Sequence, residues 1–193
     1  MGLLDKIKFF KKLMDDPELD RLYKEVKERK TSPEIAEIEN ALIRWAAFFH
    51  HHSLEYGIEH GMKVGRNSRV EPLVVFTGFD KIAIGDDFVA SSFCTIRAVD
   101  APIKIGSKVS LGPGVALIGA NHGTDPGTPH QAQPQKSAKI EIGDDVWIGA
   151  HCIILPGVKI GSGSVVAAVS VVLDDVPEKV IAAGAPAKVV RPR

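Results

Sequence analysis

His122 is the first candidate for chemistry in this chain, because it stands where a regular residue pattern gives way to a long polar segment. Asn121 precedes it at a position that is aliphatic or small elsewhere in the pattern, and residues 123–141 follow with three prolines and little apolar content. An imidazole, with an ordinary pKa of about 6.5, accepts or returns a proton at neutral pH and suits general acid–base catalysis. Taken alone, a histidine beside a loop is more often an ordinary surface residue.

The other histidines and both cysteines give weaker signals. His50, His51 and His52 are consecutive, so a helix would spread their rings instead of aiming them at one metal ion, although a zinc site with His60 stays open. A solvated helix end is the default interpretation. The two cysteines form no disulfide framework or zinc motif and occupy inward positions of the pattern, which indicates small core residues. These are Cys94 and Cys152.

The pattern is a block of six residues headed by an aliphatic residue. The heads are Ile105, Leu111, Leu117, Ile142, Ile148, Ile154, Ile160, Val166 and Val172. Glycine often follows the head, and the fifth residue is small or β-branched, as in Val109, Val115, Val146, Cys152, Val158, Ser164, Ser170 and Val176. A period of six fits neither a helix nor a strand, and it predicts a coil with three flat faces that closes after about eighteen residues. Heads and fifth residues should point inward, with glycine at corners of positive φ.

Interruptions of the pattern predict loops. Two extra residues lie between Phe76 and Ile84, three between Ile96 and Ile105, and the longest insertion is residues 123–141. Extra residues in a registered coil must bulge outward, and such bulges are places where ligands are met. The longest loop is expected to be either functional or disordered.

This pattern resembles the hexapeptide-repeat acyltransferases, and three segments look like their sugar O-acetyltransferase-like branch. They are residues 142–150, 154–161 and 183–191. The resemblance covers roughly the last two thirds of the chain. It implies a mainly β fold, a left-handed parallel β-helix, assembled as a homotrimer. It also implies an acyltransferase that moves an acetyl group from acetyl-CoA to a hydroxyl or amine of a sugar, nucleotide sugar or polysaccharide precursor.

The resemblance also assigns roles to residues. His122 would be the general base. The pantetheine arm of the cofactor would lie between subunits along Trp147, Gly149, Ala150, Ala167 and Ala168, with the phosphates near Lys188 and Arg191. Asn121, Asp125, Asn67 and Asp100 would shape the acceptor site, and no metal is expected. Two departures put cofactor affinity in question, because Ala167-Ala168-Val169-Ser170 replaces a Gly-Ala-Gly-Ser pattern and Leu173 replaces an expected cation.

The totals set further limits. Of 193 residues, 24 are basic and 24 acidic, so the net charge is zero and no nucleic-acid partner is expected. The sequence has no run of about 18 apolar residues, so integral membrane association is not expected either. Residues 1–60 predict a helical N-terminal capping region, residues 61–177 the β-helix with its loop 123–141, and residues 178–193 a C-terminal basic tail. A cytoplasmic location is expected from the reduced cysteines and from the lack of a secretory signal.

Two alternatives remain open. The first is a non-catalytic trimeric β-helix that serves as a scaffold. The second is a γ-type carbonic anhydrase, in which three histidines from adjacent coils bind zinc. That arrangement pairs two ligand histidines five residues apart, and no histidine lies five residues from His122. His130 is therefore interpreted as a loop residue that contacts an acceptor or solvent. His151 is interpreted as an outward residue at a corner of its coil.

Overall fold

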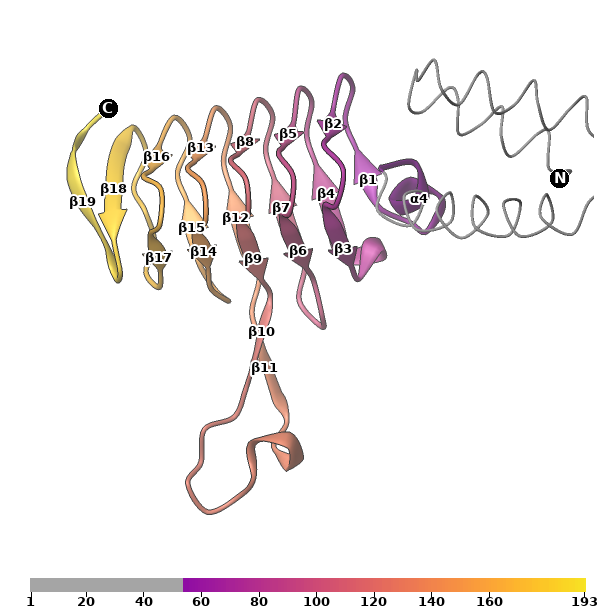
Figure 1. Cartoon of the computed structure of the whole chain (residues 1–193), viewed down its shortest axis with the longest axis vertical. Helices are drawn as coiled ribbons and strands as arrows, with labels where there is room; N and C mark the ends of the chain where they lie inside the picture. Colours follow the sequence, from indigo (N-terminus) through magenta and orange to yellow (C-terminus); the bar gives the residue numbers. More distant parts are fainter. Residues whose placement is uncertain (1–53) are drawn as a thin grey trace, which may run out of the picture. The chain divides into compact units, whose positions relative to one another are not determined.

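The computed structural model describes residues 54–193. The predicted helices before residue 54 and the cluster His50–His52 lie outside the described residues. Within the described part, a short helix, α4 (Leu54–Glu59), is followed by strands that wind into stacked coils (Figure 1). No helix among these residues has the length and apolar character needed to cross a membrane.

Three parallel sheets form the walls of the coils. Sheet A contains β1 (Lys63–Val64), β4 (Ile82–Ile84), β7 (Ile103–Ile105), β12 (Ile140–Ile142) and β15 (Lys159–Ile160). Sheet B contains β2 (Arg69–Val70), β5 (Val89–Ala90), β8 (Ser110–Leu111), β13 (Trp147–Ile148), β16 (Val165–Val166), β18 (Val180–Gly184) and β19 (Ala187–Pro192). Sheet C contains β3 (Val75–Thr77), β6 (Thr95–Arg97), β9 (Ala116–Ile118), β14 (Ile153–Ile154) and β17 (Val171–Val172). The chain visits A, B and C in turn, and the fold is the predicted left-handed parallel β-helix.

Equivalent residues of successive coils lie in register despite the insertions. Sheet C pairs Phe76 with Ile96, Ile96 with Leu117, Leu117 with Ile154 and Ile154 with Val172. At the corner between sheets A and B, hydrogen bonds link residues that are 20, 21, 37 and 18 positions apart in successive coils. The predicted insertion lengths of two, three and nineteen residues are therefore confirmed. The predicted bounds of the longest loop, 123–141, are wrong, because the chain leaves the coil at Ala120, whereas Ile140 and Glu141 belong to β12 and pair with β7.

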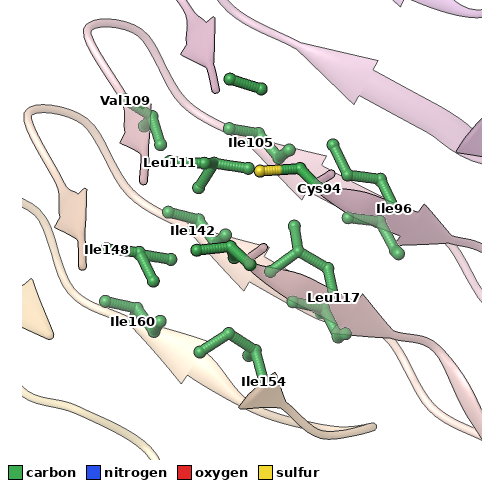
Figure 2. Packing of buried hydrophobic residues seen from close by; sticks show 14 of the residues in the cluster. Cys94, Ile96, Ile105, Val109, Leu111, Leu117, Ile142, Ile148, Ile154 and Ile160 are labelled. Atoms are coloured by element: carbon green, nitrogen blue, oxygen red, sulfur yellow. The ribbon is translucent and has the colours of Figure 1, made fainter. Parts of the chain in front are cut away.

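The core consists of the residues that the pattern directs inward. Every head and every fifth residue listed above is buried, with Val176 the most exposed at 5% among the aliphatic ones. Figure 2 shows some of these side chains in the interior of successive coils, among them Leu117, Ile148 and Ile154. Cys94 and Cys152 are fully buried, and burial raises the pKa of both thiols, so they stay protonated and act as small core residues.

The predicted reason for the second-position glycines is wrong. Positive φ occurs at the fourth residue of the block, at Lys108, Gly114, Asp145, His151, Gly157, Gly163 and Val169. The second-position glycines are needed because the next coil passes directly over them. A Cβ on Gly106 would lie 2.7 Å from the carbonyl carbon of Gly143, and one on Gly149 would lie 2.5 Å from the backbone nitrogen of Ala168. Close stacking of the coils, not a left-handed turn, excludes a side chain there.

The segment predicted as a basic tail forms the last two strands. β18 pairs in parallel with β16, and β19 pairs antiparallel with β18 (Figure 1). The Arg193 guanidinium then donates to the Asp145 carboxylate at 3.0 Å and to the Gly163 carbonyl at 2.9 Å. The β18–β19 pair thus extends sheet B past the last complete coil, and Arg193 attaches it to the corner between sheets A and B.

Candidate active site

His122 lies on a two-stranded hairpin that interrupts the third coil. Strands β10 (Ala120–His122) and β11 (Gln135–Ser137) pair antiparallel, with His122 opposite Gln135. The hairpin leaves the C-terminal end of β9 and projects away from the stacked coils (Figure 1). The prediction that Asn121 fills an inward position is wrong: the chain has already left the coil at Ala120, and Asn121 is exposed.

A buried glutamine holds the tip of the hairpin in shape. Gln133 is only 9% exposed, and its Oε1 accepts a hydrogen bond from the Asp125 backbone N–H at 2.9 Å. Its Nε2 donates to the backbone carbonyls of Asp125 at 2.9 Å and Thr128 at 2.6 Å. Gly123 is buried against this amide, and a Cβ there would lie 2.3 Å from Oε1. The loop is therefore an ordered structure around Gln133, and Asp125 belongs to it with its side chain exposed.

The loop brings a second imidazole next to His122. A short 3₁₀ helix, η2 (His130–Ala132), places the His130 ring with its centroid 5.9 Å from that of His122 and its plane at 87° to it. Both side chains are exposed. This neighbour could not be predicted from the sequence, because the approach of residues eight apart depends on how the loop closes around Gln133.

The face of the hairpin that carries His122 is directed toward the preceding coil. In an antiparallel ladder, directly paired residues and residues two apart project from the same face. His122 therefore shares a face with Ser137, which pairs with Ala120. The Ser137 hydroxyl donates to Asp100 Oδ2 at 3.4 Å, and Asp100 follows β6 in the coil before the hairpin. Asp100 is thus brought to the base of the hairpin, beneath the face of His122.

Asn67, also predicted for the acceptor site, lies elsewhere. It occupies the corner between β1 and β2 in the first coil, where its Nδ2 donates to Asp87 Oδ1 at 3.2 Å. Its φ of 57° is one of the left-handed corner values, which asparagine tolerates better than most residues. The corner between sheets A and B is not the corner from which the hairpin departs, so Asn67 is not gathered with His122.

The residues predicted along the pantetheine arm gather on one edge of the β-helix. Trp147 projects outward from β13 and is 57% exposed. Gly149 and Ala150 form the following corner between sheets B and C, and Ala167 and Ala168 form the same corner one coil later. We call these five residues the corner cluster. Val169 follows them with a left-handed φ of 62° and 69% exposure, a strained conformation for a β-branched residue.

The predicted phosphate-binding cations lie on β19. Lys188 pairs with Asp174 Oδ2 at 3.1 Å, and about 70% of each side chain is exposed, so the pair is weak and open to exchange. Arg191 donates to the backbone carbonyl of Pro192 at 3.0 Å and is otherwise exposed. Leu173, which replaces an expected cation, is 48% exposed next to Asp174.

Within one chain, His122 and the corner cluster occupy different corners. The corner cluster lies mainly between sheets B and C, before the sheet C strands, whereas the hairpin starts after a sheet C strand. The described residues contain no group of three or more histidine, cysteine, aspartate or glutamate side chains that could hold a metal ion. His60 stacks on Tyr56 with ring centroids 3.9 Å apart.

Comparison with known proteins agrees with this architecture. The family model for the bacterial transferase hexapeptide (six repeats) matches residues 139–174. Galactoside O-acetyltransferase of Escherichia coli K12 is 41% identical over 133 residues, which are 66% of this chain and 62% of that protein. The chain spans about three fifths of the length of such curated relatives.

Two solved structures match over more of their length. A hexapeptide-repeat-containing acetyltransferase of Vibrio cholerae O1 biovar eltor, complexed with acetyl coenzyme A, superposes with a TM-score of 0.66 at 33% identity and covers 84% of this chain and 90% of that one. A galactoside acetyltransferase in complex with coenzyme A gives a TM-score of 0.65 at 34% identity, over 99% and 82% of the two chains. This chain belongs to the hexapeptide-repeat acyltransferase family.

Proposed function

We propose that this protein transfers an acetyl group from acetyl-CoA to a hydroxyl of a carbohydrate, with His122 as the general base. The observation that carries the proposal is the exposed His122 on an ordered hairpin, above a neighbouring coil that offers polar groups such as Asp100. Support also comes from two relatives that are named galactoside O-acetyltransferase and from a structural neighbour in complex with coenzyme A.

The chemistry needs no enzyme nucleophile. The His122 imidazole takes the proton of the acceptor hydroxyl while the oxygen attacks the thioester carbonyl carbon. The tetrahedral intermediate collapses, the carbon–sulfur bond breaks, and the imidazolium returns the proton to the sulfur of coenzyme A. General base catalysis supplies a factor of about 10² to 10⁴. The remaining acceleration comes from holding two substrates together and from a backbone N–H that stabilises the oxyanion.

A homotrimer is part of the proposal. The hairpin projects away from its own coils. His122 would therefore reach a cofactor bound to the corner cluster of another subunit more readily than one bound to the corner cluster of its own chain. If the hairpin of one subunit faces the corner cluster of the next, each site has walls from two chains, and cyclic symmetry gives every copy the same site. Cytoplasmic location stays a prediction, in keeping with the two buried free thiols and with an acetyl-CoA donor.

The corner cluster is proposed to bind the pantetheine arm, with backbone groups at Gly149 and Ala150 as hydrogen-bonding partners and the exposed Trp147 as an apolar wall. Lys188 and Arg191 are proposed for the phosphates, and a phosphate would compete with Asp174 for Lys188. Val169 projects at this edge as a bulky addition, which is the specific observation in favour of a non-catalytic scaffold. Leu173 follows β17 and therefore lies at the other end of the sheet C strand.

A thermal-shift measurement with acetyl-CoA, coenzyme A and no ligand separates the two readings. A ligand at a hundred times its dissociation constant stabilises the folded state by about 2.7 kcal/mol. We expect both cofactors to raise the melting temperature of the wild type. Trp147→Phe keeps an aromatic side chain against the pantetheine arm, so its melting temperature should rise by the same amount. No shift with either cofactor would mean that the side chains of Ala167 and Val169 close the groove, and the scaffold would then replace the enzyme. Zinc bound at one equivalent per site would favour the carbonic anhydrase alternative.

A further inference from the structure

A hollow on the outer face of sheet C lies next to the hairpin and has no role so far. It is an open depression of about 480 Å³ on the surface, not an enclosed cavity. Two strands in register form its floor, with Val75 beside Thr95 and Thr77 beside Arg97. The segment after β6 adds the remaining lining residues, Ala98 and Val99.

Arg97 gives this hollow its charge. In the part of the chain that the structure describes, no carboxylate or other side chain is paired with its guanidinium, whereas Arg66 and Arg193 each bind an aspartate within 3.0 Å. Two hydroxyls, from Thr77 and Thr95, line the same hollow. An unpaired guanidinium with five donors in a fixed fork, next to hydroxyl donors, matches the geometry of a phosphate or a carboxylate.

The hollow and His122 lie on the same side of the molecule. Arg97 is the last residue of β6 and pairs with Ile118 of β9, which is four residues before His122. The backbone N–H of Gly119, at the root of the hairpin, donates to the Arg97 carbonyl at 2.8 Å. The face of the hairpin that bears His122 is directed toward this coil, as the contact of Ser137 with Asp100 shows. The root of the hairpin that carries the base is therefore hydrogen-bonded to the coil that contains the hollow.

We propose that the hollow around Arg97 is an anion-binding subsite of the acceptor, and that the preferred acceptor is a sugar carrying a phosphate or a carboxylate. Arg97, with Thr77 and Thr95, would hold the oxyanion while a hydroxyl of the same sugar reaches His122. The Asp100 carboxylate, already bound to the Ser137 hydroxyl, would accept hydrogen bonds from other sugar hydroxyls. This inference rests on the proposed acetyl transfer and narrows its substrate class.

The test compares glucose, glucose 6-phosphate and glucuronate as acceptors for wild type, Arg97→Gln and Arg97→Lys. We expect wild type to prefer one of the anionic sugars, and which one it prefers tells phosphate from carboxylate. Loss of a charge-assisted hydrogen bond weakens binding by about 10- to 100-fold. Arg97→Gln should therefore raise the KM for the preferred anionic sugar by about that factor with little change in kcat, and Arg97→Lys should restore part of it. Lys104→Gln, which removes an exposed cation from sheet A, is the matched control and should change neither constant.

Titration calorimetry of the same sugars into coenzyme A-saturated protein gives a readout that does not need turnover. Suppose that the wild type binds an anionic sugar, that Arg97→Gln abolishes this binding, and that no sugar is acetylated. This result would support the anion-binding subsite and overturn the proposed acetyl transfer. Acetylation of glucose at least as well as the anionic sugars, with Arg97→Gln unchanged, would overturn the subsite alone. If Arg97→Gln lost activity equally with neutral and anionic sugars, the role of Arg97 would be structural only. If the wild type bound no anionic sugar in the calorimeter, the inference would also be refuted.

Discussion

Replacing His122 by alanine is expected to lower kcat for acetyl transfer by about 10² to 10⁴-fold, the contribution of a positioned general base. The melting temperature and the shift caused by coenzyme A should stay near the wild-type values, because His122 is exposed on a hairpin whose shape depends on Gln133. Steady-state kinetics with a saturating acceptor, together with thermal shifts, measure both quantities. The loss should appear in kcat, since the proton is transferred only in the transition state.

The matched control lies on the same hairpin. Lys136 pairs with Asn121, so its side chain projects from the face opposite to that of His122. Lys136→Ala should keep full activity. If His122→Ala retained activity within a factor of about two while cofactor binding persisted, a direct transfer through this base would be refuted. If both variants lost activity equally, the hairpin as a whole and not the imidazole would be responsible.

Replacing Ile154 by alanine is expected to lower the free energy of unfolding by about 2 to 5 kcal/mol, the usual cost of truncating a buried isoleucine. Ile154 is fully buried and lies between Leu117 and Val172 of the adjacent coils. Its neighbour Ile153 belongs to the same strand but points outward and is 39% exposed. Ile153→Ala removes the same atoms from the opposite face and should cost well under half as much.

Chemical denaturation at one fixed protein concentration measures the pair, because assembly would make stability depend on concentration. Size-exclusion chromatography of each variant checks that the assembly is unchanged. A larger loss for Ile153→Ala than for Ile154→Ala would contradict the register of the coils, since a shift by one residue exchanges the two faces.

The coil and its core were predictable because every block of six residues requires an aliphatic first residue and a small or β-branched fifth residue at inward positions. Each head and each fifth residue stacks on its equivalent in the next coil, so nine weak signals add up and the insertions can be counted. The reason for glycine at position 106 could not be predicted from the sequence. Close approach of a neighbouring backbone and a positive φ both favour glycine, and the sequence does not distinguish them. The structure shows that the backbone of Gly143 passes over Gly106.

The site was less accessible to sequence reasoning. The point at which the chain leaves its coil depends on pairing between β10 and β11, so Asn121 was assigned inward although it is exposed. The approach of His130 to His122 and the closure around Gln133 are tertiary contacts of an irregular loop, which has no repeat to predict it. Arg97 was missed because outward positions of the blocks follow no pattern. The roles of His122 and the corner cluster stay predictions.

The most direct test of acetyl transfer is to incubate the purified protein with acetyl-CoA and each of a panel of neutral and anionic sugars. Release of free coenzyme A thiol is followed, and the products are analysed by mass spectrometry. The account predicts thiol release that depends on both the sugar and His122, with one acetyl group gained per sugar for each thiol released. Thiol release that is the same with and without every sugar, with no acetylated product, would contradict it.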